Sequence, residues 1–175
     1  MKKLTEAGRQ RVKWVCYALL LLLFYIVQTT PMLFQILGIK PVWVVPFAVC
    51  LSLFESEREA ATYGVFAGML WDISANKLFG FRAIILMCCC ICVALLVMYL
   101  MRNHLWNALL LVSAVMLVIQ LLDFLFFYLI WGYEHSWIIL LKYTLPTIVY
   151  TAVVTVPVYY LVRSVAKRFN QTLRM

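Results

Sequence analysis

The chain has 175 residues, of which 66% are hydrophobic and only 13% are charged, and its formal net charge is +8. Soluble domains are roughly half apolar and a quarter charged, so this composition excludes a soluble globular protein and predicts an integral membrane protein. The apolar residues form blocks near the length that crosses roughly 30 Å of hydrocarbon, without the alternation of a β-barrel. The spans are therefore expected to be helices.

The positive charge gathers at the two ends of the sequence. The basic residues there are Lys2, Lys3, Arg9, Arg11 and Lys13 before the first span, and Arg163, Lys167, Arg168 and Arg174 after the last. Basic residues concentrate on the cytoplasmic side of membrane proteins, where anionic headgroups also attract them. We therefore expect one transmembrane domain over residues 1–175, with short cytoplasmic tails at 1–13 and 163–175, and no binding of nucleic acid.

The first two predicted spans cover residues 14–30 and 41–52. The first ends in a polar cluster that includes Gln28, which could form a hydrogen bond across helices but which we expect to lie at the membrane interface. In the second, Trp43 is typical of an interfacial anchor. The acidic turn that follows, residues 55–59, is expected to be a solvated loop outside the bilayer.

The third segment, residues 60–74, carries the most distinctive pattern. Gly64, Gly68 and Asp72 recur every four residues, which places them on one face of a helix. In a bilayer, small residues mark the faces where helices pack closely. An acid in hydrocarbon is costly unless it faces protein or water. Asp72 therefore has two interpretations: a cap at the outer helix end, solvated by headgroups, or a buried group with a structural or interaction role.

The third segment is also short, because fifteen residues rise only about 22 Å. It either crosses with local thinning of the bilayer or turns back as a re-entrant segment. If it crosses, four of the 15 lysines and arginines lie outside and eleven inside; if it is re-entrant, six lie outside. The first arrangement agrees better with the cytoplasmic excess of basic residues. The sequence therefore predicts six spans with both termini in the cytoplasm.

The remaining predicted spans cover residues 80–101, 106–130 and 137–162. Gly80 opens the fourth span, and Arg82 follows closely enough to pair with Asp72 across the turn. Pairing would lower the cost of either charge. The fifth span contains Asp123, roughly two-thirds of the way across, so this acid must face protein or a wet cavity.

The stretch around these residues also resembles a known family. The pattern G-x-x-x-G-x-x-x-D followed by a short polar turn and Phe-Gly, here Gly64, Gly68, Asp72 and Gly80, is similar to the signature of the rod shape-determining protein MreD family. The resemblance covers residues 41–86 in recognisable residues and the whole chain in its hydropathy layout.

This resemblance implies a function and a fold. It implies a non-catalytic scaffold in the bacterial inner membrane, within the cell-elongation machinery that sets rod shape and makes peptidoglycan. The implied partners are an MreC-like membrane-anchored protein and, through it, the MreB filament and the peptidoglycan synthases. The implied fold is an all-α bundle of six transmembrane helices, similar to the substrate-binding membrane subunits of energy-coupling-factor transporters. The alternative is a vitamin-type transporter subunit of that kind, which binds a small ligand in an outward pocket.

The residues themselves predict no catalysis. The sequence has no nucleophile motif, phosphate loop or metal-ligand set, and no paired carboxylates at catalytic spacing, so we expect no enzyme, cofactor or metal. Cys89 and Cys92 have C-x-x-C spacing but lack a second pair or a nearby histidine. Membrane lipids are expected contacts. The candidate residues for partner binding or structure are Gly64, Gly68, Asp72, Gly80, Arg82 and Asp123.

Overall fold

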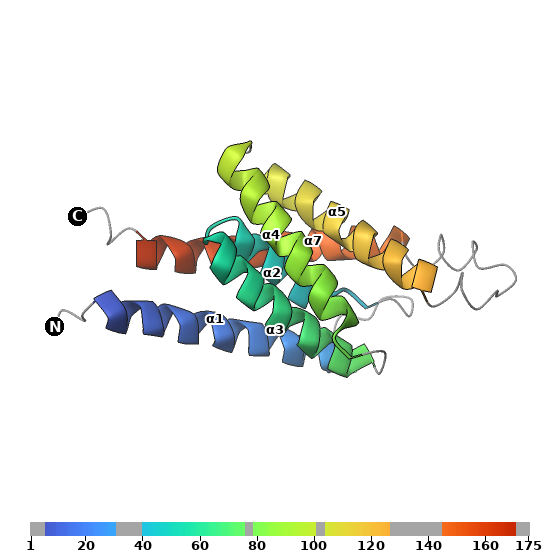
Figure 1. Cartoon of the computed structure of the whole chain (residues 1–175), viewed down its shortest axis with the longest axis horizontal. Coiled ribbons are helices and arrows are strands. Elements are labelled where there is room, and N and C mark those ends of the chain that lie inside the picture. Colours follow the sequence, from blue (N-terminus) through green and yellow to red (C-terminus); the bar gives the residue numbers. More distant parts are fainter. Residues whose placement is uncertain (1–5, 31–39, 76–78, 101–103, 127–144, 171–175) are drawn as a thin grey trace, which may run out of the picture.

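In the computed structural model, every element of the described chain is a helix (Figure 1). The structure describes residues 6–30, 40–75, 79–100, 104–126 and 145–170. The helices are α1 (Glu6–Thr29), α2 (Val44–Ser52), α3 (Glu57–Ala75), α4 (Phe81–Tyr99), α5 (Leu105–Phe124) and α7 (Leu145–Asn170). Four of them, α1, α4, α5 and α7, are long and apolar enough to cross a membrane. The chain is therefore an all-α integral membrane protein.

The short helix α2 lies inside the bundle and contacts α1, α3, α4, α5 and α7. All of its nine residues are buried, as expected for a helix that is apolar on every side. The end of α1 caps it, because Gln28 Oε1 accepts hydrogen bonds from the backbone N–H groups of Trp43 (3.0 Å) and Val44 (3.2 Å). These are groups that a helix start leaves without intrahelical partners. Gln28 thus binds across helices. The expectation that it simply lies at the membrane interface was wrong.

Two helices differ in length from the predicted spans. The nine residues of α2 rise about 14 Å, roughly half of the hydrocarbon core, so this helix is too short to cross alone. In contrast, α3 begins at Glu57, before the predicted start, and has 19 residues. Its rise of about 28 Å comes close to the hydrocarbon thickness. The helix is thus longer than predicted, but its first three residues, 57–59, are charged. α3 is not among the four described helices that are long and apolar enough to cross a membrane.

Of the later helices, α4 and α5 begin as predicted and α7 ends later than predicted. α4 begins at Phe81 and α5 at Leu105, each one residue from the predicted starts at 80 and 106. The predicted end of the fifth span and start of the sixth, within residues 127–144, lie outside the described residues. α7 continues to Asn170, past the predicted end at 162, and contains Pro157. Proline has no N–H to donate, so one backbone hydrogen bond of α7 is missing there.

Large apolar side chains cover the outside of the bundle. On α1, the exposed residues include Leu19 and Leu23, and on α5 they include Leu110 and Leu117. A helix at the surface of a soluble protein carries polar groups at such positions. These outer faces therefore match contact with lipid tails.

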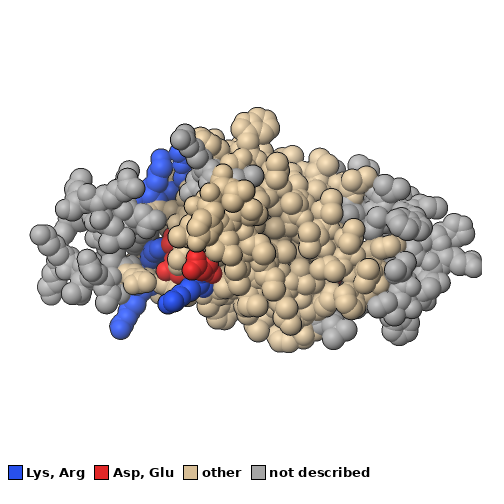
Figure 2. Space-filling model, turned by 45° about the horizontal axis from the view of Figure 1, so that its top comes forward, with Lys and Arg blue, Asp and Glu red and all other residues tan. Residues whose placement is uncertain are grey.

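Charged side chains gather at one end of the bundle, here called the basic end. α1 begins and α7 ends there (Figure 1). Figure 2 shows lysines and arginines at this end beside a group of acidic side chains, while tan residues cover most of the rest of the visible described surface. The turn between α3 and α4 lies at the opposite end (Figure 1).

Candidate functional site

The glycine face of α3 lies directly against α4. A Cβ added at Gly68 would come within 2.3 Å of Ala83 Cα and 2.9 Å of Arg82 O, and one added at Gly64 within 3.1 Å of Met87 Cα. Even a methyl group therefore cannot fit at Gly68 without moving the backbone of α4. This close approach is what small residues permit between membrane helices.

The turn from α3 to α4 depends on Gly80 and Asp72. Gly80 has φ +93°, a left-handed conformation that glycine adopts without the steric cost of a side chain. Its N–H donates to Asp72 Oδ2 at 2.8 Å, so the carboxylate on α3 lies at the start of α4, where a helix carries partial positive charge. Asp72 is only 2% exposed. It is therefore buried in the protein and not solvated at the membrane surface.

Arg82 pairs with a distant acid. Its Nη2 donates to Asp123 Oδ2 of α5, although Asp72 is much closer in sequence. The Arg82 guanidinium also lies over the ring of Trp71, 4.5 Å from the ring centroid, in a cation–π contact. We call Trp71, Asp72, Arg82 and Asp123 the buried charged cluster. It joins α3, α4 and α5.

The cluster has hydrogen-bonding capacity left over. Arg82 Nε and Nη1 and Asp72 Oδ1 are buried without a hydrogen-bond partner in the structure. A buried charge costs several kcal/mol unless it is paired, so the contacts of Arg82 with Asp123 and Trp71 decide where this side chain can lie. Within the described ranges, no group of three or more His, Cys, Asp or Glu residues could hold a metal ion.

Comparison with known families identifies the chain. The sequence model of the family described as rod shape-determining protein MreD matches residues 8–169. The chain belongs to the MreD family. Membership implies a role in rod shape determination and agrees with a place in the cell membrane. No curated protein and no solved structure matches this chain, so the expected likeness to the energy-coupling-factor subunits has no support from a solved structure.

In this MreD-family chain, the structure brings together four of the six predicted residues, Asp72, Gly80, Arg82 and Asp123. The sequence allowed Asp72 to pair with Arg82, but the structure has two separate contacts instead, Asp72 with Gly80 and Arg82 with Asp123. Trp71, which completes the cluster, was not predicted. Its position next to Asp72 was the one available signal.

A second charged group, at the basic end, was also missed. Lys13 Nζ of α1 donates to Glu55 Oε2 and, at 3.4 Å, to Glu59 Oε2, while Tyr17 Oη donates to Glu55 Oε1 at 2.8 Å. Two acids of the expected solvated loop, Glu55 and Glu59, thus link α1 to the start of α3, and the Glu55 side chain is only 4% exposed. The residues between them, 56–58, are exposed as predicted. Burial, together with the neighbouring Glu59, raises the pKa of Glu55 to about 7.

Proposed function

We propose that this MreD-family chain is a non-catalytic scaffold of the cell-elongation machinery in the bacterial inner membrane, where it binds an MreC-like partner and through it the MreB filament and the peptidoglycan synthases. The family match over residues 8–169 carries this proposal. The site supports it because Arg82 and Asp123 bind each other inside the bundle. Charges used in this way fix helices in place rather than act on a substrate.

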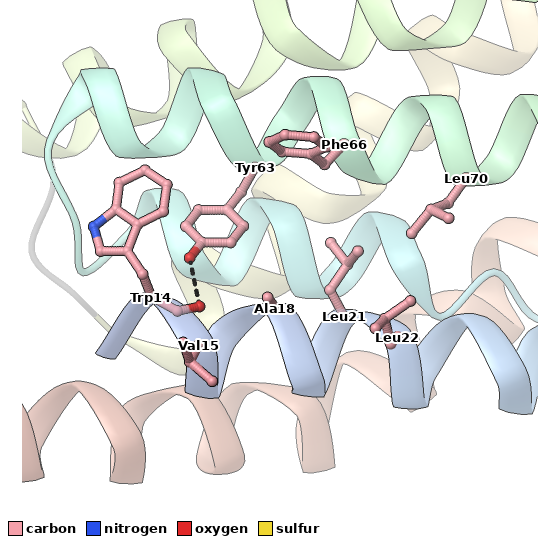
Figure 3. Close-up of a pocket in the computed structure, with 8 residues that line it drawn as sticks. All are labelled: Trp14, Val15, Ala18, Leu21, Leu22, Tyr63, Phe66 and Leu70. Carbon is pink, nitrogen blue, oxygen red and sulfur yellow. Dashed lines mark hydrogen bonds between the residues drawn. The ribbon is translucent and has the colours of Figure 1, made fainter. Parts of the chain in front are cut away.

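The transporter alternative gains no support. A ligand site of that class needs a cavity with a few convergent polar groups. A large groove among the described residues, between α1 and α3, is lined by apolar residues (Figure 3). We therefore carry the scaffold forward alone.

The scaffold is proposed to form one domain of six crossings with both termini in the cytoplasm. Gln28, near the end of α1, binds the start of α2, and Lys13, near the beginning of α1, binds Glu55 just after the end of α2. Residues 13 and 28 of one helix are about 22 Å apart along its axis. The chain from Trp43 to Glu55 thus runs back along most of α1, which supports a second crossing completed by residues before α2.

We further propose that the six candidate residues act by shaping the partner surface and do not touch the partner. Gly64 and Gly68 face α4, and the four others meet at the α3–α4 turn or the α5 contact. A helix arrangement fixed by these contacts presents one outer surface. Loss of the contacts changes that surface.

Two assays in a rod-shaped bacterium that lacks its own MreD test this proposal: restoration of rod shape, and recovery of the MreC-like protein with the purified chain. We expect wild type to succeed in both and Asp123→Asn to fail in both. Asp72→Asn keeps an oxygen that accepts from Gly80 N–H, so we expect it to succeed. Failure of wild type to recover the MreC-like protein would contradict the scaffold role. A well-folded Asp72→Asn that loses the partner would instead place Asp72 in direct contact with it.

A further inference from the structure

A groove runs between α1 and α3 on the outside of the bundle. Its volume is about 420 Å³, and its lining includes Trp14, Val15, Ala18 and Leu22 of α1 and Phe66 and Leu70 of α3 (Figure 3). The side chains of Val15, Leu22 and Phe66 are about half exposed, so the groove opens towards the surrounding membrane. Its lining reaches Leu70, next to Trp71 in the sequence, but it shares no residue with the buried charged cluster and serves none of the contacts described there.

The walls of the groove accept hydrocarbon and no polar ligand. The one hydroxyl in the lining belongs to Tyr63, and it donates to the backbone oxygen of Trp14 at 3.1 Å (Figure 3). A polar ligand would lose its hydrogen bonds to water without replacing them here. An apolar chain forms no hydrogen bonds to water, so it loses none when it enters the groove.

The length of the groove decides which apolar occupant fits. From Trp14 to Leu22 the helix rises about 12 Å, close to the depth of one leaflet, which is about 15 Å or half of the hydrocarbon core. A partner's transmembrane helix crosses both leaflets and would need a contact surface about twice as long. A lipid acyl chain ends within one leaflet.

An unused cation lies above the mouth of the groove. Arg11 is exposed and precedes Val15 by four residues and Ala18 by seven, so it lies on the same face of α1. It is about 6 Å nearer the basic end than Val15. Lys13, by contrast, is already bound to Glu55 and Glu59. Arg11 forms no ion pair with the described part of the chain, and Arg58, at the start of α3, is a second exposed cation at this end.

We propose that the groove binds one acyl chain of an anionic phospholipid from the leaflet at the basic end, and that Arg11 binds the phosphate of its headgroup. The apolar walls hold the chain, and the cation selects the charge of the headgroup. Trp14 lies between these two regions, at the depth where tryptophan is enriched in membrane proteins. The site does not depend on the scaffold role, because it involves neither the partner nor the cluster.

Native mass spectrometry of the full-length chain, purified in detergent and titrated with phosphatidylglycerol or phosphatidylcholine of the same acyl chains, tests the site. We expect one retained phosphatidylglycerol and a roughly five-fold preference over phosphatidylcholine, which is the contribution of one basic residue near a membrane surface. Arg11→Gln should remove the preference, while Lys40→Gln, an exposed cation towards the opposite end, should keep it. Equal binding of the two lipids by wild type would overturn the headgroup contact.

A second pair of variants tests the groove itself. Ala18→Phe fills the groove and should abolish the retained lipid, whereas Leu19→Phe, on the neighbouring lipid-facing position, should bind as wild type. Circular dichroism checks that both variants fold, and the smaller Ala18→Leu, with a partial loss of binding expected, replaces Ala18→Phe if that variant does not. Unchanged retention in the folded Ala18 variant would show that lipid binds the outside of the bundle non-specifically, and the proposal would be wrong.

Discussion

Arg82 of α4 and Asp123 of α5 form an ion pair inside the bundle, and each residue is only 6% exposed. Forty-one positions separate them in the sequence, so the pair forms only when α4 and α5 pack together. It therefore reports on tertiary structure and not on either helix alone. A buried pair need not add net stability, but one partner without the other leaves a charge uncompensated.

The first prediction concerns this pair. Asp123→Asn keeps the shape of the side chain but removes the charge that neutralises Arg82, so the free energy of unfolding should fall by about 3–5 kcal/mol. Denaturant unfolding of the purified chain in one detergent measures it. Glu57→Gln is the matched control, because Glu57 is exposed at the start of α3, and it should change stability by less than about 0.5 kcal/mol.

A loss of stability in Asp123→Asn can come from the unpaired charge of Arg82 or from altered packing. The double variant Arg82→Met with Asp123→Leu separates these two explanations. Apolar residues of similar volume often replace a buried ion pair without loss of stability. We therefore expect the double variant to recover most of the stability that Asp123→Asn loses. If it is as unstable as Asp123→Asn, the cost comes from packing and not from an unpaired charge.

The second prediction compares two glycines on the same face of α3. Gly68→Ala places a methyl group 2.3 Å from Ala83 Cα, whereas Gly64→Ala leaves 3.1 Å to Met87 Cα. The first should therefore cost about 1–3 kcal/mol of stability through overpacking, and the second clearly less. Thermal unfolding of both variants measures the difference. Equal midpoints for the two variants would mean that α3 and α4 are further apart than the structure places them.

The third prediction concerns the orientation of the chain in the membrane. In a background without the six native cysteines, a single cysteine at Phe79, in the α3–α4 turn, should react with a membrane-impermeant thiol reagent added outside the cell. A cysteine at Ser56, at the basic end, should react only with a permeant reagent. Both positions are exposed, so access and not burial decides the result. The reverse pattern would place both termini outside.

The part of the site that could be predicted from the sequence was predicted from the spacing of nearby residues. The four-residue repeat of Gly64, Gly68 and Asp72 fixes one helix face whatever surrounds it, and the cost of an acid in hydrocarbon indicated that Asp123 faces protein or water. The short sequence distance made Asp72 a possible partner of Arg82. In the fold, the N–H of Gly80 donates to Asp72, and Arg82 pairs with Asp123 of α5. No local sequence pattern indicates that α5 packs beside Arg82.

The sequence alone also did not decide which polar side chains bind across helices. From the sequence, Gln28 was expected at the interface, and only the structure shows that the start of α2 lies beside it. Glu55 and Glu59 read as a solvated turn because their partners, Lys13 and Tyr17, lie about forty residues earlier. Composition and hydropathy specify how polar a segment is. They do not specify which helix end comes to lie next to it.

The last prediction uses Glu55 at the basic end. Burial and the neighbouring Glu59 raise the pKa of Glu55 to about 7, from 4.5 in the absence of these effects. The folded chain therefore binds this proton more tightly than the unfolded chain, so stability from this group is fully present below pH about 4.5 and is lost as the pH rises towards 7.

We accordingly expect the unfolding midpoint of the wild type in detergent to fall between pH 5 and about 7.5. Glu55→Gln cannot titrate, and its one amide oxygen can still accept a hydrogen bond from Lys13 or Tyr17, so its midpoint should vary less over this range. Glu57→Gln, which removes an exposed acid nearby, should retain the slope of the wild type. Lys13, Tyr17 and Glu59 also face Glu55. An unfolding midpoint that rises with pH in the wild type would mean that the Lys13 ion pair outweighs burial and holds Glu55 ionised.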